Sequence, residues 1–371
     1  MTRRSPTASI PPAADERPDE VRHIRVDTTP GSRRFVVSFV VAWFACCAIV
    51  LLLSLVVDPL SSYGTRLMPP LVLNDRDEKA TAYRHLSTKP LAIILGSSRV
   101  NKFPPRCLEQ LLGVPAFNFG LNSARSEDYL AVLRFAQAQG PVRRILLGID
   151  PEAFHNVVPT EERLLSSSSL APFVDRGWRP RWPVRVTLGA VEALKWESFV
   201  SSLRSIEFLI AGRRPEPVYE FDSTGFVRYP EVERLVRAGR YELRPHINLS
   251  VADYRRRYEG YTALSSWRVA AFDEFLRIAN VAGTRVDAFI PPPHPTLVSE
   301  LAQTTLLART RETEALLSDY ERRGLLHYVP LPTLMRFGGD STLYFDGVHM
   351  MEANAVRLMN EVYRSGTCAV Q

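Results

Sequence analysis

The sequence predicts an α/β domain, with a parallel sheet covered by helices on both faces, preceded by one membrane-spanning helix. Three observations support this fold class. Residues 35–57 form an uncharged apolar stretch. Beyond residue 90, short apolar runs typical of strands buried on both faces alternate with helix-like stretches. Glycine-containing polar segments follow several of these runs, at the strand ends where parallel sheets place their sites.

The bulk composition excludes several classes of function. The chain has 371 residues, 46% hydrophobic and 23% charged, which is enough to bury a large core. The formal net charge of +6 has no zinc-finger, RNP or helix-turn-helix signature beside it, so we expect no nucleic-acid partner. The sequence also lacks a Walker loop, a dinucleotide fingerprint and zinc-ligand spacing. We therefore expect no cofactor and no metal.

The stretch 35–57 has the length of a membrane span. Its 23 residues, rising about 1.5 Å each as a helix, cover the ~30 Å hydrocarbon core with some tilt. A cleaved signal peptide is the alternative, but its apolar region is shorter and ends at a small-residue cleavage site. Here Asp58 and Pro59 follow instead, which favours an uncleaved anchor.

Flanking charges orient the span. The basic residues closely preceding it are Arg22, Arg25, Arg33 and Arg34. Arg66 is the only basic residue among the seventeen that follow it. The positive-inside rule then predicts a single-pass protein of the inner membrane. Its N-terminus is cytoplasmic and its C-terminal domain periplasmic or extracellular.

The predicted organisation has four parts. They are a flexible cytoplasmic tail (1–34), the membrane helix (35–57), a juxtamembrane connector (58–89) and an extracytoplasmic domain (90–371) with an insertion or lid at about 160–250. Strands are expected at 91–95, 116–119, 145–149 and 286–290. Helices are expected at 105–112, 127–139, 251–282 and 297–323, with a last one after His349.

Cysteine usage leaves one question open. Cys46 and Cys47 lie inside the apolar stretch, where they act as small hydrophobic residues. Cys107 and Cys368 remain for an oxidising compartment. Whether they pair is not decided, because a sequence does not supply the Cα separation that a disulfide requires.

The segment Gly96-Ser97-Ser98-Arg99 follows the first expected strand. A nucleophilic serine needs a sharp turn that lifts its Oγ from the sheet edge and aims its own amide at a developing oxyanion. Ser98 is the better candidate of the two serines. A plain strand-to-helix turn with a capping serine is the alternative.

Asp346-Gly347-Val348-His349 precedes the last expected helix. A carboxylate three residues before a histidine can accept a hydrogen bond from one ring nitrogen, which leaves the other nitrogen to activate a serine. The alternative is a purely structural role, in which the aspartate caps the following helix. Placement strengthens the catalytic interpretation, because the serine follows the first strand of the domain.

A third polar turn follows the second expected strand. It contains Asn118, Gly120 and Asn122. Gly120 allows a close approach of the backbone to a substrate and could donate its amide to an oxyanion. An ordinary turn remains the alternative. His294, in a proline-flanked segment after the fourth expected strand, is a further candidate for substrate contact or simply an exposed loop residue.

These blocks resemble those of the SGNH/GDSL hydrolase superfamily, which run Gly-Asp-Ser, an oxyanion glycine, Gly-x-Asn and Asp-x-x-His. Ser98 matches the first block, with a serine in place of its aspartate; Gly120 matches the second, and Asp346 and His349 the last. The resemblance covers residues 91–160 and 283–365. It implies a flavodoxin-type sheet.

Within the superfamily the chain is most similar to membrane-anchored envelope proteins with a Gly-Ser-Ser turn, including the D-alanyl transfer protein of teichoic acid modification and acyltransferases of exopolysaccharide assembly. That similarity implies O-acyl transfer or ester hydrolysis on a cell-envelope polysaccharide. It also implies a glycan acceptor and a membrane-embedded acyl donor protein as partners.

The third block departs from the family pattern, because Asp150 stands where the oxyanion asparagine is expected. An ionised carboxylate donates no hydrogen bond and repels an oxyanion. Three explanations stay open: pairing of Asp150 with Arg99, a degenerate site, or a donor supplied by Asn118 or Asn122. The first hypothesis is thus a serine-dependent acyltransferase or esterase. The second is a catalytically silent domain that binds glycan or scaffolds an envelope complex.

Overall fold

In the computed structural model, the described residues are 30–59, 61, 63, 65, 67, 68, 71, 74–175, 190, 191, 193–213, 219–364 and 366–369. The chain divides into two compact units, Met1–Ile49 and Val50–Gln371. The predicted cytoplasmic tail lies almost wholly outside the described residues.

One long apolar helix, α1 (Pro30–Val57), covers the predicted span. Within it, Ser32–Val57 is long enough to cross a bilayer, and its most apolar 18-residue window has a mean hydropathy of 2.9. By length and composition, therefore, α1 can span a membrane.

The second unit contains a five-stranded parallel sheet in the order β2-β1-β3-β6-β7. Its strands are β1 (Ala92–Gly96), β2 (Ala116–Gly120), β3 (Arg144–Gly148), β6 (Arg285–Phe289) and β7 (His327–Tyr328). The α/β prediction is confirmed, with the first four strands within one residue of their expected ends. The two-residue β7 was not predicted, because two residues produce no periodic pattern.

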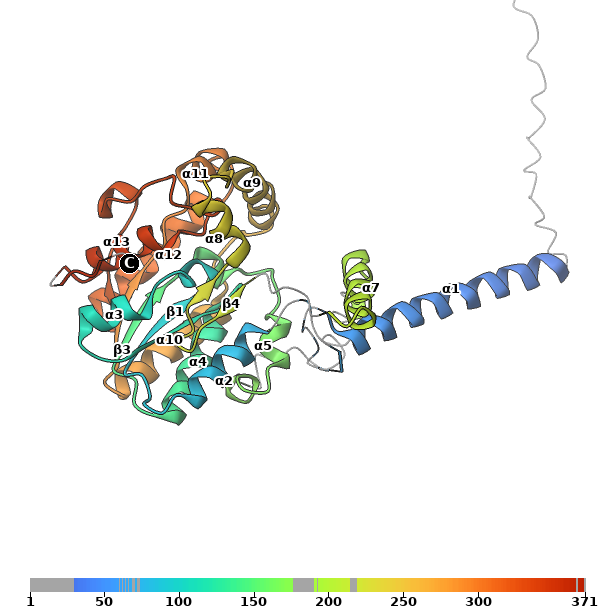
Figure 1. Ribbon diagram of the computed structural model, residues 1–371, viewed down its shortest axis with the longest axis horizontal. Coiled ribbons are helices and arrows are strands. Elements are labelled where there is room, and N and C mark those ends of the chain that lie inside the picture. Colours follow the sequence, from blue (N-terminus) through green and yellow to red (C-terminus); the bar gives the residue numbers. More distant parts are fainter. Residues whose placement is uncertain are drawn as a thin grey trace, which may run out of the picture. The chain divides into compact units, whose positions relative to one another are not determined.

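Helices cover both faces of this sheet (Figure 1). Alternate strand residues point to opposite faces, so Ile93 packs with one hydrophobic cluster and Ile94 with the other. The first cluster contains residues of α2 (Asp75–His85), α4 (Ser126–Gln139), α10 (Ser266–Val281) and α12 (Leu306–Arg322). The second contains residues of α3 (Pro105–Leu112) and α13 (Glu352–Val362).

Helix α2 lies within the stretch expected to be a connector. It buries Ala80 and Tyr83 in the first hydrophobic cluster and also buries the charged Arg76 and Lys79. Its high density of charged residues is typical of an exposed segment, which is why the sequence pattern did not reveal a core helix.

Two long helices were predicted where the structure has pairs. The stretch expected as 251–282 contains α9 (Leu243–Glu259) and α10, separated at Gly260, which ends α9. The stretch 297–323 contains α11 (Pro295–Glu300) and α12. Between these two, Thr304 Oγ1 bonds to the carbonyl of Leu301 and to the amide of Leu306, so a side chain replaces helical backbone bonds.

The region 160–250 is mostly helical where it is described. Its elements are α5 (Glu162–Ser166), α7 (Trp196–Ile210), the antiparallel pair β4 (Glu220–Phe221) and β5 (Val227–Arg228), α8 (Pro230–Arg237) and the start of α9. The Pro/Arg/Trp cluster at 176–189, which suggested an insertion, lies outside the described residues.

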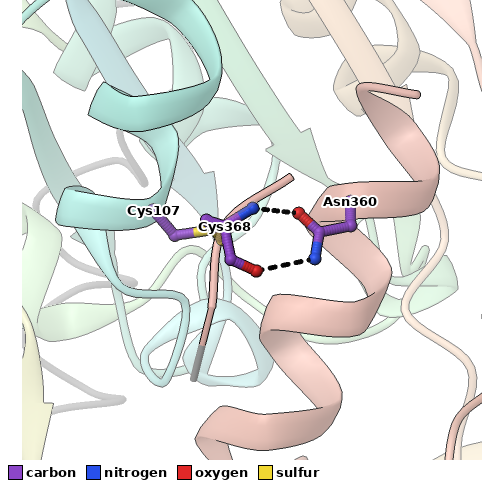
Figure 2. The surroundings of a disulfide bond; sticks show 3 residues. All are labelled: Cys107, Asn360 and Cys368. Atoms are coloured by element: carbon purple, nitrogen blue, oxygen red, sulfur yellow. Dashed lines mark hydrogen bonds between the residues drawn. A yellow bond between two sulfur atoms is a disulfide. The ribbon is translucent and has the colours of Figure 1, made fainter. Parts of the chain in front are cut away.

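Cys107 on α3 and Cys368 form a disulfide, with a Cα–Cα separation of 5.4 Å. Figure 2 shows Asn360 of α13 beside this bond. Its side chain accepts a hydrogen bond from the amide of Cys368 (2.8 Å) and donates one to its carbonyl (2.9 Å). The disulfide therefore ties the C-terminal segment to α3, on the face of the sheet that α13 also covers.

Candidate active site

Ser98 stands at the carboxyl end of β1, on a turn that glycines make possible. Gly96 has φ +154°, and a Cβ there would lie 2.5 Å from the carbonyl oxygen of Gly148 on the neighbouring strand. The chain then enters a short 3₁₀ helix, Ser98–Val100, in which Ser97 Oγ accepts a hydrogen bond from the amide of Arg99 at 3.2 Å. Ser97 is the capping serine and Ser98 is left to face the site.

The structure brings Ser98, His349 and Asp346 together. Ser98 Oγ lies 2.8 Å from His349 Nε2, and His349 Nδ1 lies 2.7 Å from Asp346 Oδ2. The other carboxylate oxygen, Oδ1, accepts hydrogen bonds from the amides of Val348 (2.7 Å) and His349 (2.8 Å). The carboxylate is therefore fixed relative to the imidazole ring.

The electrostatics of Asp346 define the tautomer of His349. Burial alone would raise the pKa of Asp346. The adjacent His349, together with the hydrogen bonds to its ring and to two amides, outweighs burial and lowers that pKa to about 2. An ionised carboxylate only accepts hydrogen bonds, so His349 Nδ1 carries the proton. Nε2 is then free to accept the proton of Ser98 Oγ, which is the arrangement required of a general base.

A small polar cavity of about 160 Å³ opens beside these three residues. The turns after β1, β2 and β3, the segment around Asp346 and helix α9 supply its walls. Lining residues besides the three include Ser123, Arg125, Asp150, Glu152, Tyr254 and Arg257. The cavity therefore meets the carboxyl edge of the sheet, where parallel α/β folds bind ligands.

Arg99 and Asp150 form an ion pair at this edge. Arg99 Nε lies 3.2 Å from Asp150 Oδ1, although the two groups are not aligned as a hydrogen bond. The guanidinium also reaches Glu152 Oε1 (3.1 Å) and the hydroxyl of Tyr254 (3.2 Å). Three explanations were open for the aspartate at the position of the oxyanion asparagine. Of these, the pairing of Asp150 with Arg99 is present in the structure.

Burial and charge act in opposite directions on the titration of this pair. Burial lowers the pKa of Arg99, but the surrounding groups, Asp150 first and then Tyr254 and Glu152, together raise that pKa well above its usual value. Burial likewise raises the pKa of Asp150, against the opposing attraction of Arg99. Arg99 is therefore always charged, and it provides the partner that a buried Asp150 carboxylate needs.

Two expected oxyanion donors are already occupied within the protein. The amide of Gly120 donates to Asn118 Oδ1 at 2.7 Å, and its carbonyl accepts from the buried Lys79 at 2.6 Å. Burial lowers the pKa of this lysine to about 7. Asn118 is fully buried and donates to the carbonyls of Val100 and Phe103. Gly120 and Asn118 therefore stabilise the turn after β2, and neither lines the cavity.

Asn122 and His294 are also held away from the cavity. Asn122 donates its amide to Asp75 at 2.5 Å and its side chain to the hydroxyl of Tyr219 at 3.4 Å. His294 is buried at the start of α11, where its Nδ1 accepts a hydrogen bond from the amide of Thr296. It supports the site indirectly, because its own amide donates to the carbonyl of Gly347.

Sequence reasoning missed Glu152, Tyr254 and Arg257 at the cavity. Tyr254 and Arg257 belong to α9. The sequence predicted a long helix over 251–282 there, but did not predict where that helix packs. The dense aromatic and arginine pattern from 254 to 261 was the available signal. Among the described residues, no group of three or more His, Cys, Asp or Glu side chains is arranged to hold a metal ion.

The chain was compared with protein families, curated proteins and solved structures. No family model matches the chain, and no curated protein matches it. Among solved structures, the chain is similar to one described as a putative platelet activating factor from Streptococcus pneumonia. The match has 13% identity, covers 78% of this chain and 92% of that one, and has a TM-score of 0.32.

Proposed function

We propose that the protein is a serine-dependent enzyme acting on an acyl ester, with Ser98 as nucleophile. The observation that supports this most directly is the continuous chain of hydrogen-bonding distances from Ser98 Oγ to His349 Nε2 (2.8 Å) and from His349 Nδ1 to Asp346 Oδ2 (2.7 Å). A nucleophile, a base and a group that orients the base are the three parts required for acyl transfer through serine.

In the first step His349 Nε2 takes the proton of Ser98 as Oγ bonds to the acyl carbon. The carbonyl oxygen becomes an oxyanion. When the bond to the leaving alcohol breaks, His349 returns the proton to that alcohol, and an acyl-Ser98 ester remains. A second hydroxyl, from water or from an acceptor, then loses its proton to His349 as its oxygen bonds to the acyl carbon. The bond between that carbon and Ser98 Oγ breaks, and His349 returns the proton to Oγ, which restores the serine. Asp346 stays ionised throughout and stabilises the imidazolium.

The backbone amide of Ser98 is the oxyanion donor in this proposal. Ser98 is the first residue of its 3₁₀ helix, and amides in the first turn of a helix have no acceptor within that helix. Asp150 would oppose the oxyanion if its charge were uncompensated. Its pairing with Arg99 offsets that charge.

Transfer to a glycan hydroxyl is our preferred form of the reaction. It follows from the resemblance to membrane-anchored envelope acyltransferases, together with an apolar helix able to hold the site beside a membrane. In this view the acceptor is a cell-envelope polysaccharide and the acyl donor is a membrane-embedded protein. Hydrolysis uses the same steps with water as acceptor.

A serine-directed fluorophosphonate tests the proposal. The wild-type protein should be labelled covalently and Ser98→Ala should not. Ser123→Ala is the matched control, because Ser123 lines the same cavity, and it should label like the wild type. Equal labelling of Ser98→Ala and wild type would remove Ser98 from the mechanism.

A silent glycan-binding domain is the second candidate, favoured by Asp150 at the position of the usual oxyanion asparagine. It predicts an unlabelled wild-type protein that nevertheless binds envelope glycan, with binding unchanged in Ser98→Ala. The Ser98–His349 distance favours the enzyme, because the two groups are already within hydrogen-bond reach.

A further inference from the structure

Helix α7 (Trp196–Ile210) buries small polar residues and exposes large apolar ones. Its buried residues are Ser198, Ser202 and Ser205. Trp196, Leu203 and Ile210 are 71%, 47% and 82% exposed. Residues seven apart lie two turns along one face of a helix, so these three form one stripe of exposed apolar residues. The exposed Glu207 lies on the same side, between Leu203 and Ile210, where a long side chain can carry its carboxylate towards water. A helix that packs only against a protein core has the opposite arrangement.

Exposed apolar residues are concentrated in this segment. In the described part of the chain after α1, eleven large hydrophobic residues are exposed, and six of them lie between 191 and 210. These six are Val191, Leu194, Trp196, Leu203, Leu209 and Ile210. Single exposed hydrophobic residues are ordinary on a soluble surface, whereas a contiguous group marks a surface that meets another apolar phase.

The start of α7 lies against the end of the apolar helix α1. Ser54 Oγ, in the last turn of α1, donates a hydrogen bond of 2.8 Å to the carbonyl of Ala193, three residues before Trp196. Both residues belong to the unit Val50–Gln371. If α1 crosses a bilayer, its last turn is at the bilayer surface, and the stripe on α7 begins there.

The polar flank of α7 fits the same location. Glu197 and Arg204 are both exposed, are also seven apart, and lie about 100° around the helix from the stripe. An interfacial helix combines an apolar face in the acyl boundary with a charged face among the headgroups. Tryptophan, here Trp196, is enriched at that depth.

We propose that α7 is a membrane-surface helix and a second contact of the domain with the bilayer, with Trp196, Leu203 and Ile210 inserted at the headgroup–acyl boundary. These three side chains would contact lipid and not another protein surface. This inference depends on α1 spanning the membrane and is independent of the proposed chemistry at Ser98.

Spin-label accessibility in the full-length protein tests the proposal. The background carries Cys46→Ala and Cys47→Ala, since Cys107 and Cys368 are joined in a disulfide. Leu203→Cys and Ile210→Cys are labelled with a nitroxide, and Glu197→Cys and Arg204→Cys are the matched controls on the same helix. Each protein is reconstituted in phosphatidylcholine–phosphatidylglycerol vesicles. Collision with oxygen, which is concentrated in lipid, is compared with collision with a water-soluble nickel chelate.

Labels at 203 and 210 should favour oxygen over nickel several-fold, and labels at 197 and 204 should favour nickel. Circular dichroism and thermal melting confirm that each variant is folded. Nickel-favouring labels at all four positions would overturn the proposal, because the stripe would then face water. Labels at 203 and 210 shielded from both reagents would also overturn it, because a protein surface would then cover the stripe.

Discussion

Arg99 Nε lies 3.2 Å from Asp150 Oδ1, and the two side chains are only 3% and 6% exposed. Each residue follows a strand of the parallel sheet, β1 and β3 respectively, and these strands are hydrogen-bonded neighbours. The pair thus occupies the edge of the sheet directly beside Ser98. Its burial leaves both charges little contact with bulk water, so each depends on the other as a partner.

Asp150→Asn should therefore destabilise the protein, even though it restores the residue usual in the resembling superfamily. A fully isolated buried charge costs about 3–5 kcal/mol, and we expect about 1–3 here because Arg99 keeps Glu152 as a partner. Denaturant unfolding measures the change. Asp253→Asn, which removes an exposed carboxylate from the same cavity, should stay within about 0.5 kcal/mol of wild type. An Asp150→Asn protein that is stable and hydrolyses a small ester faster would contradict the pairing role.

Asp346→Asn should disable the proposed reaction while leaving Ser98 in place. The asparagine side chain can donate to Nδ1 and so favours the tautomer whose proton lies on Nε2, where it cannot accept the proton of Ser98. We expect ester turnover to fall by about four orders of magnitude, as expected for loss of the orienting carboxylate of a triad. Fluorophosphonate labelling rates give the same comparison. Unchanged turnover would mean that His349 is not oriented by Asp346.

The same substitution should change acid stability. The pKa of Asp346 is depressed to about 2 in the folded protein, so its stabilising contribution is present above an unfolded pKa near 4. It is lost as the pH falls through 4 towards 2. The contribution is on the order of 2 kcal/mol, reduced by partial exposure of the carboxylate. Unfolding free energies measured from pH 5 to pH 2 should therefore fall more steeply for wild type than for Asp346→Asn. Parallel curves would refute the assignment.

Much of this geometry followed from where polar residues stand relative to strands. Ser98 follows β1 directly, and the carboxyl ends of parallel strands meet at one edge, so its position at the site could be predicted. Asp346 and His349 were identified because a carboxylate three residues before a histidine can orient its ring. Its contact with Ser98, 251 residues away, depends on tertiary packing that no local pattern encodes.

The failures have physical causes of the same kind. Gly120 has the right position for an oxyanion donor, but the side chain of Asn118 folds back onto its amide, and such local competition is not visible from residue type alone. The contribution of Tyr254 was missed because the expected helix 251–282 carried no indication of where it packs, and α9 is a separate helix that begins at Leu243. Lys79 was assigned to a connector because charged residues are rarely fully buried.

Loss of the Cys107–Cys368 disulfide should destabilise the domain. The bond joins residues 261 apart and so restricts the unfolded chain over a long loop. We expect a loss of about 2–4 kcal/mol in Cys107→Ser, with a lower melting temperature. Cys368→Ser should give the same loss, and the double variant no more than either single one. Cys46→Ser, which removes a thiol from α1, should not change the melting temperature of the domain. A wild-type protein whose melting temperature is insensitive to reductant would contradict this prediction.

A reporter of topology tests the predicted orientation. A fluorescent protein that matures only in the cytoplasm should be bright when fused to the N-terminus and dark when fused to the C-terminus, because basic residues precede the span. A periplasmic alkaline phosphatase fusion should give the complementary result. The reverse pattern would place the domain and its substrates in the cytoplasm.

The distance along the chain between Ser98 and His349 has a consequence for biosynthesis. A ribosome synthesises Ser98 long before His349, which follows it by 251 residues, and Cys368 comes later still. Until His349 has been synthesised and folded, Ser98 Oγ therefore lacks the imidazole that lies 2.8 Å from it in the folded domain. In the proposed mechanism, a chain that stops before His349 has no general base and cannot transfer an acyl group.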